Sequence, residues 1–246
     1  MRIAPAIAIL LTTLPLRADT PGLLAGAIHK LIADEDHWAF TQTTLRFDKS
    51  GKPEGGPTVE RYDPSKPLDE EWQLVQYSGH APTELEAHIW RWQKEKAMKH
   101  HGEKTLGDVL DLDRATLASE TPVSATYLVP ILKDASERFP ADKLEVFMSV
   151  DKQLGALTSF SLRPKEPFRI GGVVKVESGD LEGRLDVVKE NTTPALVWWK
   201  GSGRLRILGL IPVGIGRQAS YADFKRVTPF NDRFEVKIGD VKALNF

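Results

Sequence analysis

A period of two in the second half of the chain limits the fold more than any other feature of the sequence. From Leu144 onward, apolar residues such as Val146 and Met148 alternate with polar or aromatic ones, and the pattern returns at 168–177 and 233–238. Successive side chains of a β-strand point to opposite faces, so this alternation predicts strands with one buried face. Because no long helical segment follows any of these strands, we expect an antiparallel meander rather than a parallel sheet of βαβ units.

Turn-forming residues mark where neighbouring strands should be joined. Glycine, proline, aspartate and serine are frequent at 151–155, 163–167, 178–183 and 200–203. Such clusters between apolar runs are typical of turns. We therefore expect each of the four segments to connect two strands.

One apolar segment breaks the alternation. The odd-numbered positions from Leu205 to Ile215 are mostly apolar, but Leu208 and Leu210 are apolar as well. A strand that is apolar on both faces is covered on both faces, either by a helix or by a ligand in a cavity. Leu208 and Leu210 are therefore candidate ligand-binding residues.

The first half of the chain mixes helices with strands. Thr20 and the proline that follows it are typical of a helix start, and the helical spacing of apolar residues ends near Asp34. Aromatic and β-branched residues then predict strands at 38–47, 59–62 and 72–77.

A second helix is expected to begin at Thr83, whose hydroxyl can cap it, with Glu86 completing a capping box. Gly102 is a natural end for this helix. Its apolar side chains fall on one narrow stripe, which we expect to face the sheet and to make the helix a lid over the apolar surface. The candidate ligand-binding residues of this stripe are Leu85, Ile89 and Trp92.

The N-terminal residues have the three-part layout of a cleavable secretory signal: Arg2, an apolar stretch at 3–16, and a polar exit. The apolar stretch is shorter than the roughly twenty residues that a membrane-spanning helix needs. We expect residues 1–18 to be removed and residues 19–246 to form a single exported domain. The chain contains no cysteine, so it has no disulfide and no site for bacterial lipidation, and we expect a soluble protein.

A dinucleotide fingerprint of the form G-x-G-x-x-A is matched by Gly214, Gly216 and Ala219. The fingerprint requires a strand that leads directly into a helix, whose N-terminus binds the pyrophosphate. The residues after Ala219 are typical of a strand, and Pro212 interrupts the entry. We reject this site and expect the glycines to mark a bulge or a tight turn.

The remaining patterns do not favour catalysis or nucleic-acid binding. The formal net charge is -1, without the basic excess of nucleic-acid-binding domains. His80, Glu84 and His88 match no zinc signature, and the chain has neither a G-x-S-x-G elbow nor a phosphate-binding loop. The sequence therefore predicts a binding protein with no catalytic residue, no metal site, no cofactor and no nucleic-acid partner.

The order of these segments resembles the periplasmic lipoprotein-carrier family. An N-terminal helix, strands as far as Tyr77, a helical insertion at 83–117 and a meander from Leu144 follow one another in the same way. The resemblance rests on order and pattern and assigns no binding residue. It implies an unclosed barrel, with helices over the concave face of a curved antiparallel sheet and acyl chains held between. A noncatalytic carrier that binds a lipid or an acylated protein is the function it implies.

Two other functions stay open on the same scaffold. One is a protein-interaction or envelope-sensing module, and the more distant one is a hydrolase. Tryptophans beside basic residues, as at 90–99 and 198–206, also suit the lipid–water boundary, which favours transient membrane contact, although tryptophans that plug the core are the plainer interpretation. An empty apolar cavity would favour the carrier, a sheet packed solid against its helices would favour the interaction module, and convergent buried polar groups would favour the hydrolase.

Overall fold

The computed structural model of the chain describes residues 20–101, 106–133, 140–207 and 211–231. The expected signal at 1–18 and the expected strand at 233–238 lie outside these ranges. In chain order, the elements are α1 (Thr20–Glu35), β1 (Trp38–Phe47), β2 (Thr58–Tyr62), β3 (Trp72–Gln76), α2 (Glu84–His101), β4 (Thr116–Glu120), β5 (Ser124–Val129), β6 (Leu144–Asp151), β7 (Ala156–Pro164), β8 (Phe168–Ile170), β9 (Val174–Asp186), β10 (Ala195–Ile207) and β11 (Ile211–Arg226).

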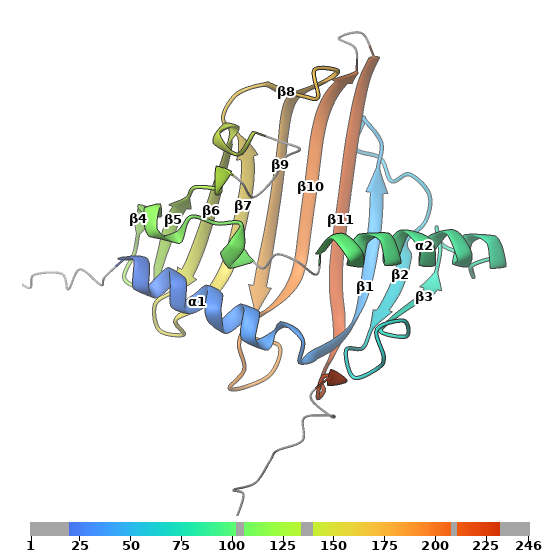
Figure 1. The fold of residues 1–246 in the computed structure, drawn as a ribbon, viewed down its shortest axis with the longest axis horizontal. Helices are drawn as coiled ribbons and strands as arrows, with labels where there is room; N and C mark the ends of the chain where they lie inside the picture. The colour runs from blue at the N-terminus through green and yellow to red at the C-terminus, as the bar shows by residue number, and fades with distance from the viewer. Residues whose placement is uncertain (1–19, 102–105, 134–139, 208–210, 232–246) are drawn as a thin grey trace, which may run out of the picture.

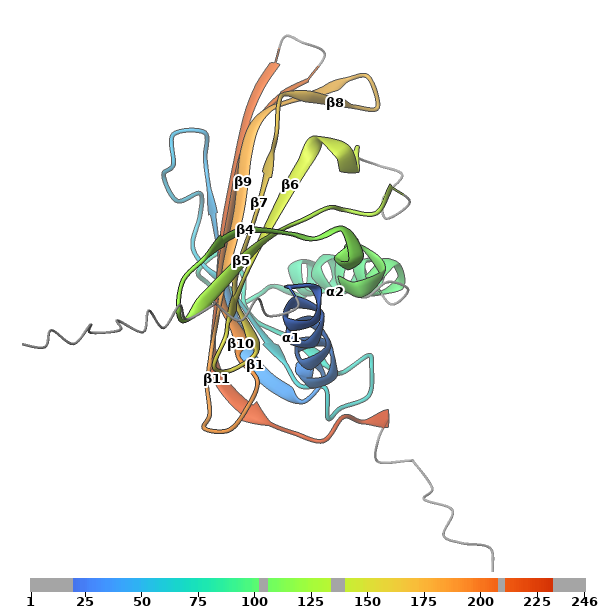
Figure 2. The ribbon, with the colours of Figure 1, turned by 90° about the vertical axis from the view of Figure 1, so that its left-hand side faces the viewer.

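The described strands form one eleven-stranded sheet in the order β3-β2-β1-β11-β10-β9-β7-β6-β5-β4, with β8 paired to β9. The pairings are antiparallel, and the two edge strands β3 and β4 do not meet, so the sheet is unclosed. The sheet curves, and both described α-helices lie on its concave face (Figures 1 and 2). The predicted fold class, a curved antiparallel sheet with helices over one face, is confirmed.

α1 covers the apolar core of one half of the sheet. Leu24, Ala27 and Ile28 are buried at helical spacing and pack on the inward side chains of β5, β6, β7 and β9. Tyr127 and Val150 are among the fully buried residues on that side. The core of the molecule therefore lies between α1 and this half of the sheet.

α2 crosses the other half of the sheet, over β11, β1, β2 and β3 (Figure 1). The predicted capping box is confirmed, since the Thr83 amide donates to Glu86 Oε2 at 2.9 Å and the Glu86 amide donates to Thr83 Oγ1 at 3.3 Å. Among the α2 side chains at 84–96, which the structure describes, only Trp90 is buried.

The prediction that the apolar stripe of α2 faces the sheet is wrong. Leu85, Ile89 and Trp92 are 67%, 43% and 56% exposed. Trp90 and Lys94, one turn apart, face the sheet instead, because they reach polar partners there. Counting only apolar residues misses this face of the helix.

Two of the four predicted turns are wrong, because the segments 178–183 and 200–203 lie inside β9 and β10. Glycine inside a strand often marks a place where another group approaches closely. Gly183 is such a case, since a Cβ there would lie 2.3 Å from the ring of Phe160, which covers the glycine from the neighbouring strand.

The apolar run 205–215 is not one strand with two apolar faces. It spans the end of β10 and the start of β11, and the register pairs Leu205 with Val213. The odd-numbered residues of both strands therefore share the concave face. Leu208 and Leu210 lie outside the described residues.

The glycines of the rejected dinucleotide fingerprint lie inside β11, which continues as a strand to Arg226. Neither a bulge nor a tight turn occurs at Gly214 or Gly216, contrary to the prediction. A Cβ on Gly214 would lie 2.6 Å from the Cα of Lys49, so the glycine allows the loop after β1 to approach the strand.

Candidate functional site

An open, mostly apolar trough of about 700 Å³ lies on the sheet face that carries the helices, at the end away from α1. Its lining includes aliphatic and aromatic side chains from β7, β8, β9 and β10: Leu162, Phe168, Val176, Leu181, Trp199 and Leu205. Binding sites for small molecules are typically about 300–1,000 Å³ and mostly apolar. The trough therefore has the size and the lining of a ligand site.

Glycines make room for this trough. Gly179 and Gly203 lie directly opposite each other on β9 and β10, and Gly201 faces Leu181 in the same sheet. A Cβ on Gly203 would lie in ordinary van der Waals contact with Ile215 Cγ1 at 3.5 Å and with the Ser178 carbonyl oxygen at 3.6 Å, so a larger side chain there would project into the trough. The same segments that resemble turns in the sequence are thus the floor of the candidate site.

Apolar side chains continue beyond the trough to the ends of β10 and β11. Ile207, Ile211 and Ile215 are 37%, 56% and 54% exposed, and all three lie on the concave face. Contiguous exposed apolar surface of this kind usually marks a place where a ligand, a partner or a membrane binds.

A polar cluster holds α2 to the other half of the concave face. Glu60 on β2 is 6% exposed and accepts hydrogen bonds from Trp90 Nε1 at 2.5 Å and Gln42 Nε2 at 3.1 Å. Lys94 Nζ lies 3.0 Å from Glu60 Oε1 and 3.5 Å from the centroid of the Trp72 ring. Burial lowers the pKa of Lys94, and the carboxylate of Glu60 opposes that shift. We call Glu60, Gln42, Trp72, Trp90 and Lys94 the α2 latch.

Aromatic residues connect the α2 latch to the trough. The Phe40 ring contacts Trp72 on one side and Tyr221 on the other, with ring centroids 6.0 and 5.2 Å apart. Trp199 lines the trough and donates a hydrogen bond from Nε1 to Tyr221 Oη at 3.0 Å. The two halves of the concave face are therefore continuous through Trp199.

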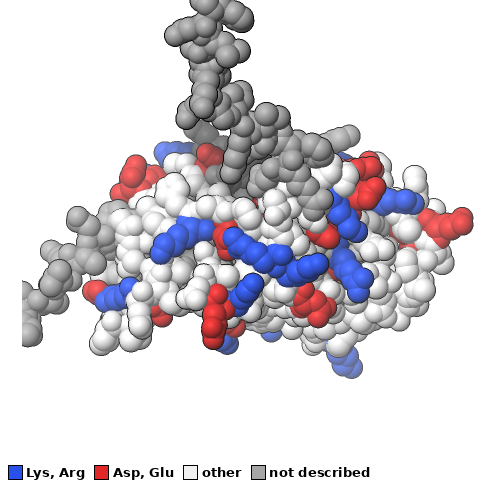
Figure 3. Space-filling model, turned by 90° about the horizontal axis from the view of Figure 1, so that it is seen from below, with Lys and Arg blue, Asp and Glu red and all other residues white. Residues whose placement is uncertain are grey.

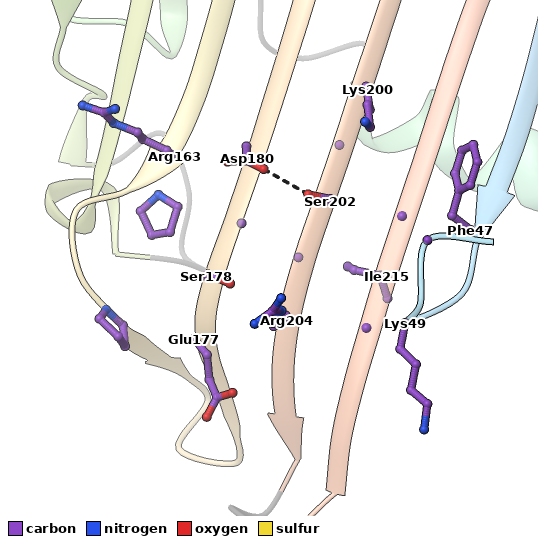
Figure 4. A pocket seen from close by; sticks show the side chains of 18 of the residues that line it. Phe47, Lys49, Arg163, Glu177, Ser178, Asp180, Lys200, Ser202, Arg204 and Ile215 are labelled. Carbon is purple, nitrogen blue, oxygen red and sulfur yellow. Dashed lines mark hydrogen bonds between the residues drawn. The ribbon is translucent and has the colours of Figure 1, made fainter. Parts of the chain in front are cut away.

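The convex side of the same strands carries a groove of a different kind, about 860 Å³ in volume and shown in Figure 4. Lys200, Arg204, Glu177 and Asp180 line it, so both signs of charge are present. Ser202 donates a hydrogen bond to Asp180 at 3.0 Å. Charged and polar residues alternating with concave-face residues are typical of the solvated face of an antiparallel sheet.

The sequence-predicted site residues do not meet at the trough. Leu85, Ile89 and Trp92 are exposed on α2, and none of them lines it. Leu208 and Leu210 lie outside the described residues. The sequence patterns did not identify the floor glycines or the α2 latch as parts of a site. The one signal for the latch is the i, i+4 spacing of Trp90 and Lys94, which places both residues on one side of the helix.

The described residues were also compared with what a metal site and a membrane-spanning helix require. Within those ranges, no three histidine, aspartate or glutamate side chains are placed to hold a metal ion. Glu84 and His88 are exposed on α2. None of the helices in the described part of the chain is both long and apolar enough to cross a membrane.

Charge is mixed on the lower face of the molecule. In Figure 3, basic side chains run across this face with acidic ones beside them. A surface on which the two signs of charge are mixed does not select a partner by charge alone.

Comparison of the chain with protein-family models, with curated proteins and with solved structures gives no match.

Proposed function

We propose that this protein is a noncatalytic carrier that binds the acyl chains of lipids or acylated proteins in the periplasm. The observation that carries the proposal is the apolar trough on the concave face, with its glycine floor. The order of the elements, which resembles that of the periplasmic lipoprotein-carrier family, supports the same function.

The hydrophobic effect explains why an acyl chain would bind in the trough. Apolar surface left in water costs about 25 cal/mol per Å² relative to burial, and α1 covers only one half of the sheet. An alkyl chain laid in the trough would remove apolar surface of both partners from water. The lining side chains are mostly aliphatic or aromatic, which suits burial of a chain and not activation of a reacting group.

The alternative is a protein-interaction or envelope-sensing module, and one observation favours it. Leu85, Ile89 and Trp92 form an exposed apolar stripe on α2, and Lys96 Nζ lies 5.3 Å from the Trp92 ring centroid. An apolar stripe with a basic neighbour suits a partner protein or a transient membrane contact.

The binding role of the trough can be tested by a substitution that fills it with a larger side chain. Gly203→Val places a branched side chain on the trough floor, whereas Lys200→Val places the same side chain on the convex face of the same strand, outside the trough lining. Binding of a fluorescent fatty-acyl probe should weaken on the order of tenfold or more for Gly203→Val, because each displaced methylene contact is worth about 0.8 kcal/mol. Lys200→Val should bind the probe as the unmutated protein does.

Stability measured on the same samples separates this effect from unfolding. Valine has a higher strand propensity than glycine, so Gly203→Val should melt at the same temperature or higher. Lipids extracted from protein purified out of its native compartment, identified by mass spectrometry, would supply the ligand. Absence of probe binding by the unmutated protein, or equal binding by both variants, would contradict the carrier proposal.

A further inference from the structure

Two arginines face each other at one end of the trough. Arg46 on β1 and Arg217 on β11 are direct partners in the antiparallel register, and both lie on the concave face. Both are exposed. Residues directly opposite on one face have Cβ atoms about 4.5–5.5 Å apart, so like charges in these positions repel.

Nothing in the described part of the chain neutralises this pair. Neither guanidinium forms an ion pair or a hydrogen bond with any residue there. Glu54, an acid that also lines this end of the trough, donates its backbone amide to Arg46 but forms no ion pair with either arginine. The other acid of the trough lining, Asp180, accepts a hydrogen bond from Ser202 on the convex face. On the concave face, two guanidinium groups and one carboxylate therefore leave an excess of positive charge at this end of the trough.

We propose that Arg46 and Arg217 bind the anionic headgroup, a carboxylate or a phosphate, of an amphiphile whose acyl chain lies in the trough. This inference rests on the proposed carrier function and names its ligand class. Guanidinium groups present paired donors that match carboxylate and phosphate oxygens, and such charge-assisted hydrogen bonds are about twice as strong as neutral ones.

The surroundings of the pair suit such a ligand. Arg217 faces Gly201 on its other side, and the apolar side chains of Leu181 and Trp199 lie over that glycine. Ile215 lies two residues along β11 on the same face, at a rise of about 3.4 Å per residue. The change from cationic to apolar lining therefore takes place within one strand repeat, as the change from headgroup to chain does in a lipid.

The test compares a charged and a neutral probe with the same chain. Binding of cis-parinaric acid and of its methyl ester is titrated by fluorescence at pH 8 for the unmutated protein and for the double variant Arg46→Gln, Arg217→Gln. We expect the double variant to lose on the order of tenfold or more in affinity for the acid and to keep its affinity for the ester, because only the acid loses charge-assisted hydrogen bonds to the two guanidinium groups.

A matched control removes two positive charges from the opposite face of the sheet. Lys200→Gln with Arg204→Gln alters the convex groove of Figure 4 and leaves the trough unchanged. This control should bind both probes as the unmutated protein does. An equal loss in the control, or an equal loss for acid and ester in the arginine variant, would overturn the inference.

Stability and competition supply further readouts. Arg217→Glu places opposite charges on the two strands, so the unliganded protein should melt at the same temperature or higher while the preference for the acid is lost. Inorganic phosphate, compared with chloride at equal ionic strength, should not displace the acid probe. Displacement by phosphate alone would indicate a simple anion site and overturn the amphiphile. If the unmutated protein binds both probes equally, this inference fails and the carrier function stands; if it binds neither, both fail.

Discussion

The two helices lie on the same face of one sheet but are held by opposite kinds of contact. α1 is held by Leu24, Ala27 and Ile28, which are buried in an apolar cluster. α2 is held by Trp90 and Lys94, which bind a buried carboxylate, while its apolar stripe faces outward. The sheet is the same, and only the side chains of the helices and the strands beneath them differ.

This difference predicts that separating each helix from the sheet has a different free-energy cost. Separating α1 from the sheet exposes apolar surface and leaves cavities, which water does not compensate. Separating α2 returns charged groups to water, and their hydration offsets much of the lost attraction. The α2 half should therefore open at a lower free energy than the α1 half, as is usual for elements that move during binding.

The largest effect is expected from the core beneath α1. Ile28→Ala should lower the free energy of unfolding by about 2–5 kcal/mol, because it leaves a cavity in a fully buried cluster. Urea denaturation followed by circular dichroism measures this loss. Gly26→Ala, at an exposed position of the same helix, should instead be neutral or stabilising by up to about 1 kcal/mol. A loss below about 1 kcal/mol for Ile28→Ala would show that α1 is not the better anchored helix.

A smaller global effect is expected from Trp90, although its side chain is larger. Trp90→Ala should undock α2 without unfolding the rest, so amide exchange should accelerate in α2 and stay unchanged in β6 and β7. Trp92→Ala, at an exposed position, should change stability by no more than about 0.5 kcal/mol. If Trp92→Ala had the larger effect, the apolar stripe would be the docking face after all.

The ion pair of the α2 latch should contribute less again. Glu60→Gln keeps an acceptor for Trp90 but leaves the Lys94 ammonium without its partner. Breaking a fully buried pair costs about 3–5 kcal/mol, and since Lys94 is partly exposed we expect about 1–3 kcal/mol. Adding Lys94→Met should restore part of this loss in a double-mutant cycle. Both Glu60→Gln and Trp90→Ala weaken the same attachment of α2. The loss in free energy of unfolding of the double variant should therefore be smaller than the sum of the two single losses.

The smallest effect is a pH dependence carried by Glu71, which directly precedes the edge strand β3. Burial raises the pKa of Glu71, and the charge of Asp36 raises it further. The native state then holds this proton more tightly than the unfolded chain, so the stability due to this group is present at acidic pH and is lost as the pH rises through the raised pKa.

Asp36→Asn removes the repulsion at Glu71 and should raise the melting temperature at pH 7 by an amount equivalent to a few tenths of a kcal/mol. At pH 4 Glu71 is protonated more often, so the same substitution should raise it less. Thermal melts of both proteins at the two pH values measure the difference. A larger gain at pH 4 than at pH 7 would contradict the assigned cause of the shift.

The site was harder to predict than the fold, for reasons visible in particular residues. Strands such as β1 and β6 agree with their predicted ranges, because alternation of side chains is a property of each strand alone. Gly201 and Gly203 were expected in a turn, because conformational freedom is the usual reason for a glycine. In the structure these glycines leave room for the trough in front of the sheet, and no local sequence pattern indicates this role. The Arg46–Arg217 pair depends on a register between residues far apart in the chain.

By itself, the sequence determined the class of fold, the helix α1 with its inward face, the capped start of α2 and most of the strands, because each follows from a repeat or a cap within a few residues. Only the tertiary structure decided which face of α2 is buried, that two glycine-rich segments are strand interiors, and that two arginines meet beside an apolar trough. The partners that decide these features are distant, as Glu60 is from Trp90, thirty residues along the chain. A local sequence pattern shows which secondary structure a residue favours. Whether a charge is buried, or whether the space above a glycine stays open, depends on what the folded chain places opposite that residue.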